Sequence, residues 1–198
     1  MKKNKNQNRG FTLVELIVVL VILAILAAIL VPALLGYIDE AKTKQNVLNA
    51  KNCLTATQAE LSKRYAVRKS TDKTAAGDVA AANSYGDLYL DGTDFAKSIL
   101  ETADDDPYVF LVGAGNYSKY IGSDPHKAYT CYFAVYWADK NSDPLFFDGN
   151  EWRRDYPWKG TGMNTFNVNG EDIDLQFYIL KRGANVPFTE LQNYLKKK

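Results

Sequence analysis

The chain of 198 residues carries 24 Lys and Arg against 23 Asp and Glu, with 46% hydrophobic residues, which fits one folded domain plus a short extension. The near-zero net charge provides no overall field that makes nucleic acid an obligatory partner. Two cysteines and one histidine exclude zinc ribbons, zinc fingers and disulfide-stapled miniproteins, which need four ligands or several bridges.

The first 38 residues combine a cationic start with a long apolar run. Residues 1–10 contain four cations, and Leu16–Val31 is sixteen consecutive Leu, Ile, Val and Ala residues. Twenty residues from Leu16 to Leu35 lack a charge, which is about the length that a helix needs to cross a bilayer. The positive-inside rule then places the N-terminus in the cytoplasm and the chain after Ile38 outside.

Glu15 is the exception to this apolar pattern. An acidic side chain costs about 3 kcal/mol near the bilayer centre, whereas thirteen Leu, Ile and Val residues at roughly 0.4 kcal/mol each return about 5 kcal/mol. Insertion remains favourable, but the carboxylate needs a partner, and no Lys, Arg or His lies between Phe11 and Glu40. The partner must therefore come from elsewhere.

The string Gly10-Phe11-Thr12-Leu13-Val14-Glu15 between the cationic leader and the apolar helix resembles the N-terminus of a type IV pilin or pseudopilin precursor. The resemblance covers residues 1 to about 40. It implies that a membrane prepilin peptidase cuts between Gly10 and Phe11 and that Phe11 is then N-methylated. It also implies that the amine of Phe11 on a neighbouring subunit neutralises Glu15, a pair that a low-dielectric bundle strengthens.

The segment after the apolar run is expected to continue as a helix to residue 66. Pro32 removes a backbone donor and Gly36 follows, so we expect a kink or local melting there, a weak stretch that filaments of this family use for subunit fit. Beyond it, apolar residues recur at three- and four-residue steps and predict a stripe that packs on a sheet. The stripe consists of Ile38, Ala41, Val47, Ala50, Leu54, Leu61 and Tyr65.

The remaining chain predicts two hairpins after a long connection. Residues 67–127 are expected to form this connection, with one short helix at Thr93–Glu101 and a turn at Asp104–Pro107. The predicted strands are Tyr129–Trp137, Leu145–Phe147, Thr165–Val168 and Ile173–Leu180. A short terminal helix is expected from Phe188 to Lys197. The predicted fold class is α+β and pilin-like, with a long N-terminal helix packed on a four-stranded antiparallel sheet.

Cys53 lies beside the apolar stripe, and Cys131 lies in the first predicted strand. A bridge between them is compatible with the extracytoplasmic side and would contribute about 4 kcal/mol in the chain-entropy model. Two unconnected buried thiols are the other interpretation, and both stay open.

Two further features of the sequence resemble ligand sites. Asp139, Asn141 and Asp143 have the alternate spacing of a calcium loop, but Pro144 and Asn150 occupy its sixth and twelfth positions, so we favour a polar turn and expect no metal. Trp137, Trp152, Tyr156 and Trp158 form an aromatic group that could stack on sugar, although packing on a sheet is the favoured interpretation.

These observations predict a non-enzymatic structural subunit that needs no cofactor. We divide the chain into a removable leader at 1–10, a transmembrane and filament-core helix at 11–38, and the amphipathic helix half with an extracytoplasmic globular domain at 39–198.

The resemblance implies a homopolymer with other pilin subunits, a prepilin peptidase, an inner-membrane assembly platform and membrane lipid as partners. The subunit would move from the cytoplasmic membrane to a surface filament that supports adhesion, twitching motility or uptake. The alternatives are a pseudopilin of a type II secretion or DNA-uptake machine and a pilus-associated carbohydrate-binding adhesin.

Overall fold

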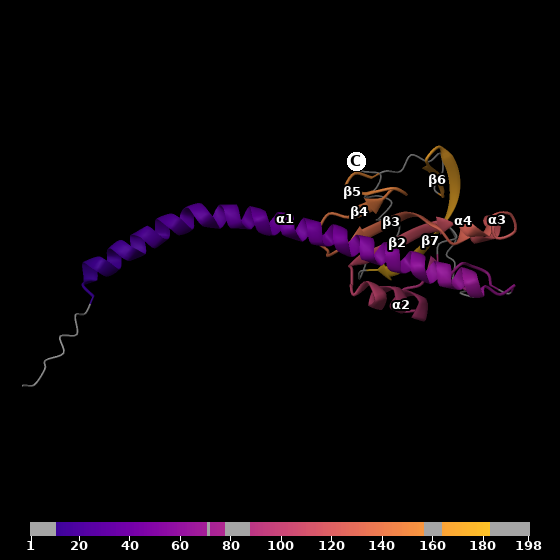
Figure 1. Cartoon of the computed structure of the whole chain (residues 1–198), viewed down its shortest axis with the longest axis horizontal. Coiled ribbons are helices and arrows are strands. Elements are labelled where there is room, and N and C mark those ends of the chain that lie inside the picture. Colours follow the sequence, from indigo (N-terminus) through magenta and orange to yellow (C-terminus); the bar gives the residue numbers. More distant parts are fainter. Residues whose placement is uncertain (1–10, 71, 78–87, 157–163, 183–198) are drawn as a thin grey trace, which may run out of the picture. The chain divides into compact units, whose positions relative to one another are not determined.

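A computed structural model describes residues 11–70, 72–77, 88–156 and 164–182. The chain divides into two units, residues 1–45 and 46–198. The predicted terminal helix at 188–197 and the leader at 1–10 lie outside the described residues. The elements are α1 (Leu13–Val67), β1 (Leu88–Tyr89), α2 (Asp94–Ala103), β2 (Val109–Gly115), α3 (Tyr117–Tyr120), α4 (Pro125–Ala128), β3 (Cys131–Trp137), β4 (Leu145–Phe147), β5 (Trp152–Arg153), β6 (Thr165–Val168) and β7 (Glu171–Arg182) (Figure 1).

The globular unit is built on one mixed sheet, which confirms the α+β fold and corrects the strand count. Its strands follow the order β1-β7-β2-β3-β4-β5, and β6 pairs with β7. The described residues therefore contain seven strands where four were predicted, and β1 runs parallel to β7 rather than antiparallel. Two parallel strands need a long connection between them, and β1 and β7 are far apart in the sequence.

The largest difference from the sequence prediction is β2, which lies within the stretch predicted as a connection. All seven of its residues are buried, and it pairs with β3 on one side and β7 on the other. A central strand that is covered on both faces has a continuous apolar run instead of alternating apolar and polar residues. The alternation that predicts a strand is therefore missing from the sequence of β2.

Residues 46–67 of α1 pack on this sheet and define one side of the core. Five side chains of this helix segment are buried, namely Ala50, Cys53, Ala56, Thr57 and Leu61. Val47, Leu54 and Tyr65 of the predicted stripe are partly buried against the core, whereas Ile38 and Ala41 are exposed. The buried part of the stripe therefore begins at Val47.

Gln58 fixes the register of α1 on the sheet. Its side-chain Nε2 donates to the Tyr129 carbonyl, and its Oε1 accepts from the Cys131 amide, each at 2.9 Å. The side-chain amide of Gln58 thus pairs with one backbone donor and one backbone acceptor where β3 begins. Buried backbone groups at a strand end need such partners.

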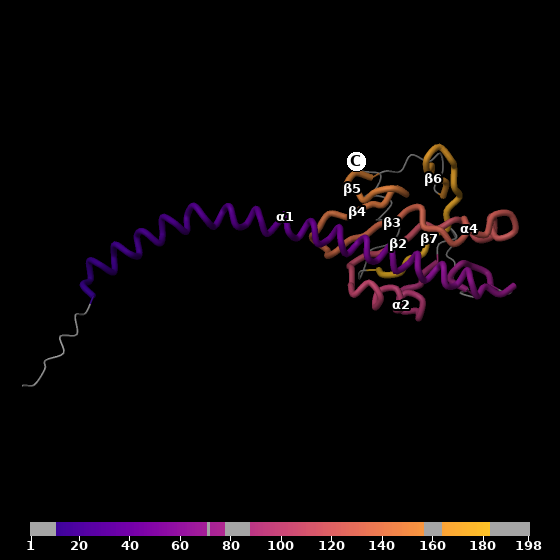
Figure 2. The backbone as a smooth tube through the Cα atoms, viewed as in Figure 1, coloured from indigo at the N-terminus to yellow at the C-terminus, as the bar shows by residue number. Residues whose placement is uncertain are grey.

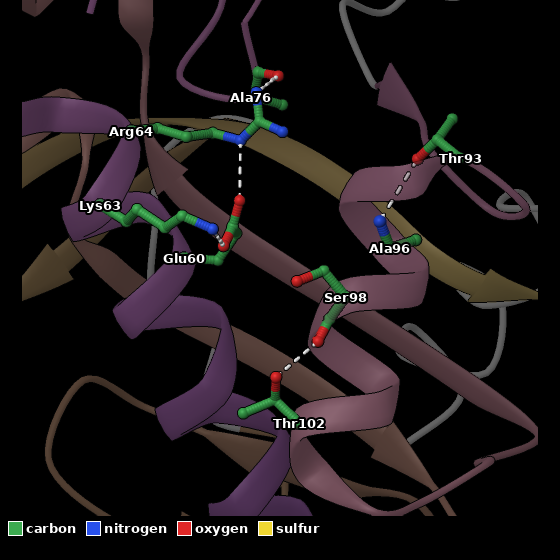
Figure 3. A network of polar contacts seen from close by, with 8 residues as sticks. All are labelled: Glu60, Lys63, Arg64, Ala76, Thr93, Ala96, Ser98 and Thr102. Atoms are coloured by element: carbon green, nitrogen blue, oxygen red, sulfur yellow. Dashed lines mark hydrogen bonds and ion pairs between the residues drawn. The ribbon is translucent and has the colours of Figure 1, made fainter. Parts of the chain in front are cut away.

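The helix α2 lies beside α1 and is joined to it through Arg64 (Figure 3). The Arg64 guanidinium bonds to the Ala76 carbonyl at 2.7 Å, pairs with Glu60 at 3.2 Å and lies 4.8 Å above the Phe95 ring. Thr93, whose hydroxyl accepts from the Ala96 amide, caps the start of α2, close to the predicted start of this helix.

Asp105 forms a polar contact between α1, the end of α2 and the sheet. Asp104 adopts a left-handed conformation (φ 52°) at the end of α2, and the next residue carries its carboxylate to α1 and β3. The carboxylate accepts from the Tyr136 hydroxyl at 2.7 Å, from the Asn49 amide at 3.3 Å and from the Cys53 thiol at 3.6 Å. One side chain thus satisfies donors from two elements.

Replacement of Asp105 by Ala should destabilise the globular unit by about 2 kcal/mol, because hydrogen bonds to charged groups are worth about 1.5–3 kcal/mol and three donors lose their acceptor. The measurement is urea unfolding of the detergent-solubilised full chain, followed by Trp fluorescence. Tyr136→Phe should cost about 1 kcal/mol, and the double variant should cost less than the sum of both. Additive effects would show that the Asp105–Tyr136 bond contributes nothing.

Candidate functional site

The beginning of α1 carries a reciprocal capping arrangement between Thr12 and Glu15. The Glu15 carboxylate accepts from the Thr12 amide at 2.8 Å and from the Thr12 hydroxyl at 2.7 Å. The Glu15 amide in turn donates to the Thr12 hydroxyl at 3.3 Å. This is the capping-box geometry, in which an N-cap Thr and a Glu three residues later satisfy each other's backbone donors.

The capping box explains how Glu15 is accommodated before assembly. Glu15 lies in the first turn of the helix, where the exposed amides and the helix dipole favour a negative charge. The hydrogen bonds hold the carboxylate against Thr12, the residue next to Phe11. An amine created at Phe11 would therefore lie next to Thr12, which binds the Glu15 carboxylate.

The sequence contains the signal for this arrangement, but the analysis of composition and charge missed it. A Thr followed three residues later by Glu, directly before an apolar run, is a helix-start pattern. Thr12 thus joins Gly10, Phe11 and Glu15 as a residue of the candidate site.

The apolar segment of α1 presents its side chains outward on all faces. Every residue from Phe11 to Lys42 is exposed, including Leu16, Ile25 and Leu35 at more than half of their surface. Among the described residues, α1 is the helix that by length and composition could cross a membrane. A helix that is apolar all round must be covered by lipid or by other helices.

Pro32 and Gly36 lie inside an uninterrupted helix, as the tube in Figure 2 shows. Residues 28–36 are all helical, so the local melting considered from the sequence is not seen, and the kink stays a prediction. The contribution of Pro32 and Gly36 to assembly stays a prediction for the packed filament.

Comparison with known proteins identifies the N-terminal segment. Residues 5–31 match the family model described as the prokaryotic N-terminal methylation motif. The match includes Gly10, Phe11, Thr12 and Glu15 and ends before the globular unit. No curated protein and no solved structure is significantly similar to the chain.

The motif and the apolar helix together indicate what kind of N-terminal segment the chain carries. The segment is a class III signal peptide of the kind found in type IV pilins and pseudopilins. The chain therefore has the N-terminus of a type IV pilin-like or pseudopilin precursor, which implies processing by a prepilin peptidase and anchoring in the membrane before assembly.

The aromatic residues considered as a sugar-binding surface do not share one face. The register pairs Ala134 with Phe147 and Phe147 with Trp152, so these three side chains lie on one side of the sheet. Trp137, three residues after Ala134, points to the other side. Trp158 lies outside the described residues.

The aromatic side chains instead pack within the globular unit. Trp137 contacts the Tyr108 ring edge-on at 5.6 Å and donates its Nε1 hydrogen to the Ser142 carbonyl. Tyr156 packs edge-on against Phe133 and Phe146. This agrees with the favoured interpretation of these rings as packing groups.

Cys53 and Cys131 are both free thiols, so the bridge considered from the sequence is absent from the structure. Burial first, and then the neighbouring Asp105 carboxylate, raise the pKa of the Cys53 thiol well above its usual range. Burial also raises the pKa of Cys131 to about 12. Burial therefore disfavours the thiolate form at both positions.

The loop considered for calcium closes on itself. The Asp139 carboxylate accepts from the Asn141 amide at 2.8 Å, and the Ser142 hydroxyl bonds to the Asp139 backbone. The part of the chain that the structure describes contains no group of three His, Cys, Asp or Glu residues suited to a metal ion. Asp139, Asn141 and Asp143 thus belong to a self-capped polar turn.

Proposed function

We propose that this chain is a structural subunit of a type IV pilus, which polymerises through its apolar N-terminal helix after the leader is removed. The role is mechanical and needs no catalytic residue. The observation that carries the proposal is the Thr12–Glu15 capping box, which lies within the methylation motif at the start of the exposed apolar segment of α1.

The apolar surface supports polymerisation for a physical reason. Residues 16–35 lack charge and expose their side chains, so they are stable only in lipid or against other apolar helices. When the apolar helix moves from lipid into a bundle of helices, its apolar surface stays covered, so the hydrophobic effect changes little. Polar pairs then decide in which register neighbouring helices associate.

Glu15 supplies such a polar pair. In the precursor, its carboxylate is held by Thr12. Cleavage after Gly10 removes the four leader cations and creates an amine at Phe11, which provides the opposite charge that Glu15 lacks along its own apolar segment. Cleavage therefore both releases the cytoplasmic anchor and generates the assembly partner of Glu15 on a neighbouring copy.

The first experiment is mass spectrometry of the mature N-terminus. We expect a chain that begins at N-methylated Phe11, because the resemblance to type IV pilin precursors implies a scissile bond between Gly10 and Phe11, and the matched motif spans both residues. An intact Met1 or a cut beyond residue 35 would contradict the proposed pathway.

Fractionation separates the proposed pilus subunit from a pseudopilin, which would share this N-terminal segment. A pilus subunit should be abundant in filaments sheared from the cell surface. A correctly processed chain that stays in the envelope and never enters filaments would overturn the pilus assignment in favour of the pseudopilin alternative.

A further inference from the structure

A groove lies along α2, on the side where β7 ends. Its volume is about 590 Å³, and its lining includes Ala96 and Leu100 of α2 together with Lys181 of β7. Five carboxylates border it against two lysines, Lys97 and Lys181; the carboxylates are Asp91, Glu101, Asp104, Asp105 and Asp106. We call this feature the α2 groove. It combines an apolar floor with an excess of negative charge.

The internal contacts leave part of this negative charge without compensation. Lys181 pairs with Asp106, and Asp91 accepts from the Arg182 amide. Glu101 and Asp104 are exposed, and among the residues that the structure describes no cation pairs with either of them. The α2 groove thus suits a cationic segment with an apolar component.

The end of α1 and the residues that follow it have the complementary charge. Residues 63–73 contain five cations and one acid, Asp72. Arg64 is turned inward to Glu60 and Ala76, but the other four cations are exposed; we call Lys63, Arg68, Lys69 and Lys73 the basic tip. The Arg68 guanidinium lies 4.5 Å above the Tyr65 ring, which gives this end an aromatic surface as well.

The basic tip cannot reach the acid-rich end of the groove in its own chain. Asp105 at that end contacts Cys53, whereas the basic tip surrounds the end of α1 at Val67. Fourteen residues of helix separate them, which is about 21 Å at 1.5 Å per residue. The two surfaces are different patches of the same unit, which is what a heterologous head-to-tail contact between copies requires.

We propose that the basic tip of one subunit docks into the α2 groove of a second copy of this chain. This inference rests on the proposed function, since it assigns the contact between globular units in the polymer. Lys69 and its neighbours face Glu101 and Asp104, and the Tyr65–Arg68 surface covers Leu100. A single exposed ion pair contributes little, but the contact contains several pairs and recurs at every subunit.

Cysteine cross-linking in cells tests the contact directly. Full-length chains carrying Lys69→Cys are produced together with full-length chains carrying Glu101→Cys, and disulfide-linked heterodimers are measured on non-reducing gels after mild oxidation. The matched control pairs Lys69→Cys with Asn150→Cys, an exposed loop position outside the groove. We expect at least fivefold more heterodimer for the 69–101 pair than for the control. Equal yields would overturn the inference.

A charge swap provides the second readout. Lys69→Glu and Glu101→Lys should each lower the filament yield several-fold, and a chain carrying both changes should recover at least half of the loss. Normal filaments from both single variants, with no 69–101 cross-link, would overturn the docking inference and leave the pilus assignment intact. A 69–101 cross-link in the envelope without surface filaments would support the docking inference and contradict the pilus assignment.

Discussion

Glu15→Ala should leave cleavage after Gly10 and membrane insertion intact while it lowers the yield of sheared filaments by at least about tenfold. Removal of one partner of a buried ion pair costs about 3–5 kcal/mol, and about 1.4 kcal/mol already corresponds to tenfold. Insertion should persist, because the apolar residues outweigh the cost of the carboxylate and Ala removes that cost. The measurement is the amount of chain in sheared filaments relative to the amount of processed chain in membranes.

Two further variants separate the charge of Glu15 from its capping role. Glu15→Gln keeps a side-chain oxygen that can accept from Thr12 but removes the charge. Thr12→Val removes the hydroxyl but keeps the charge. If the charge drives assembly, Glu15→Gln should lower the filament yield almost as much as Glu15→Ala. Thr12→Val should then assemble better than either of these variants. Wild-type yields from Glu15→Ala, with unchanged processing, would refute the assembly role.

The second large effect is expected at Gly115, the last residue of β2. A Cβ atom at this position would lie 2.2 Å from the Lys127 carbonyl oxygen and 2.7 Å from its carbon, both backbone atoms of α4. Gly115→Ala must therefore displace either α4 or the end of the strand. We expect a loss of about 3 kcal/mol in the free energy of unfolding, the upper part of the range for overpacked cores.

Gly122→Ala is the matched control for Gly115→Ala. No atom lies within 4 Å of a Cβ at Gly122, so its effect should stay within about 0.5 kcal/mol. Urea unfolding of the detergent-solubilised full chain, monitored by Trp fluorescence, compares the two variants. Equal midpoints for both would show that the backbone of α4 does not approach β2 as closely as the structure indicates.

Local signals allowed several elements to be predicted from the sequence. The strands at Leu145–Phe147 and Thr165–Val168 have the predicted bounds, and β7 extends its predicted range by two residues at each end. The Asn169-Gly170 pair turns the second hairpin with positive φ at both residues, as its sequence indicates. Such turns and alternating patterns depend only on neighbouring residues.

Contacts between distant residues could not be predicted in the same way. Asp105 was read only as part of a turn, because its partners on α1 and β3 lie 52 and 31 residues away. The central strand β2 lacks alternation, since both of its faces are buried. The N-terminal site was accessible because its chemistry lies within a few adjacent residues, and the Thr12–Glu15 capping pattern is also written in the sequence.

The position of β7 affects when the globular unit can fold. This strand is the last described element of the chain, yet it lies between β1 and β2 and pairs with both of them. The apolar surface of β2 therefore lacks one neighbour until residues 171–182 are available to pair with it. A fold dominated by such distant pairings closes slowly. Until β7 pairs, the unfolded chain must stay soluble and out of contact with other copies.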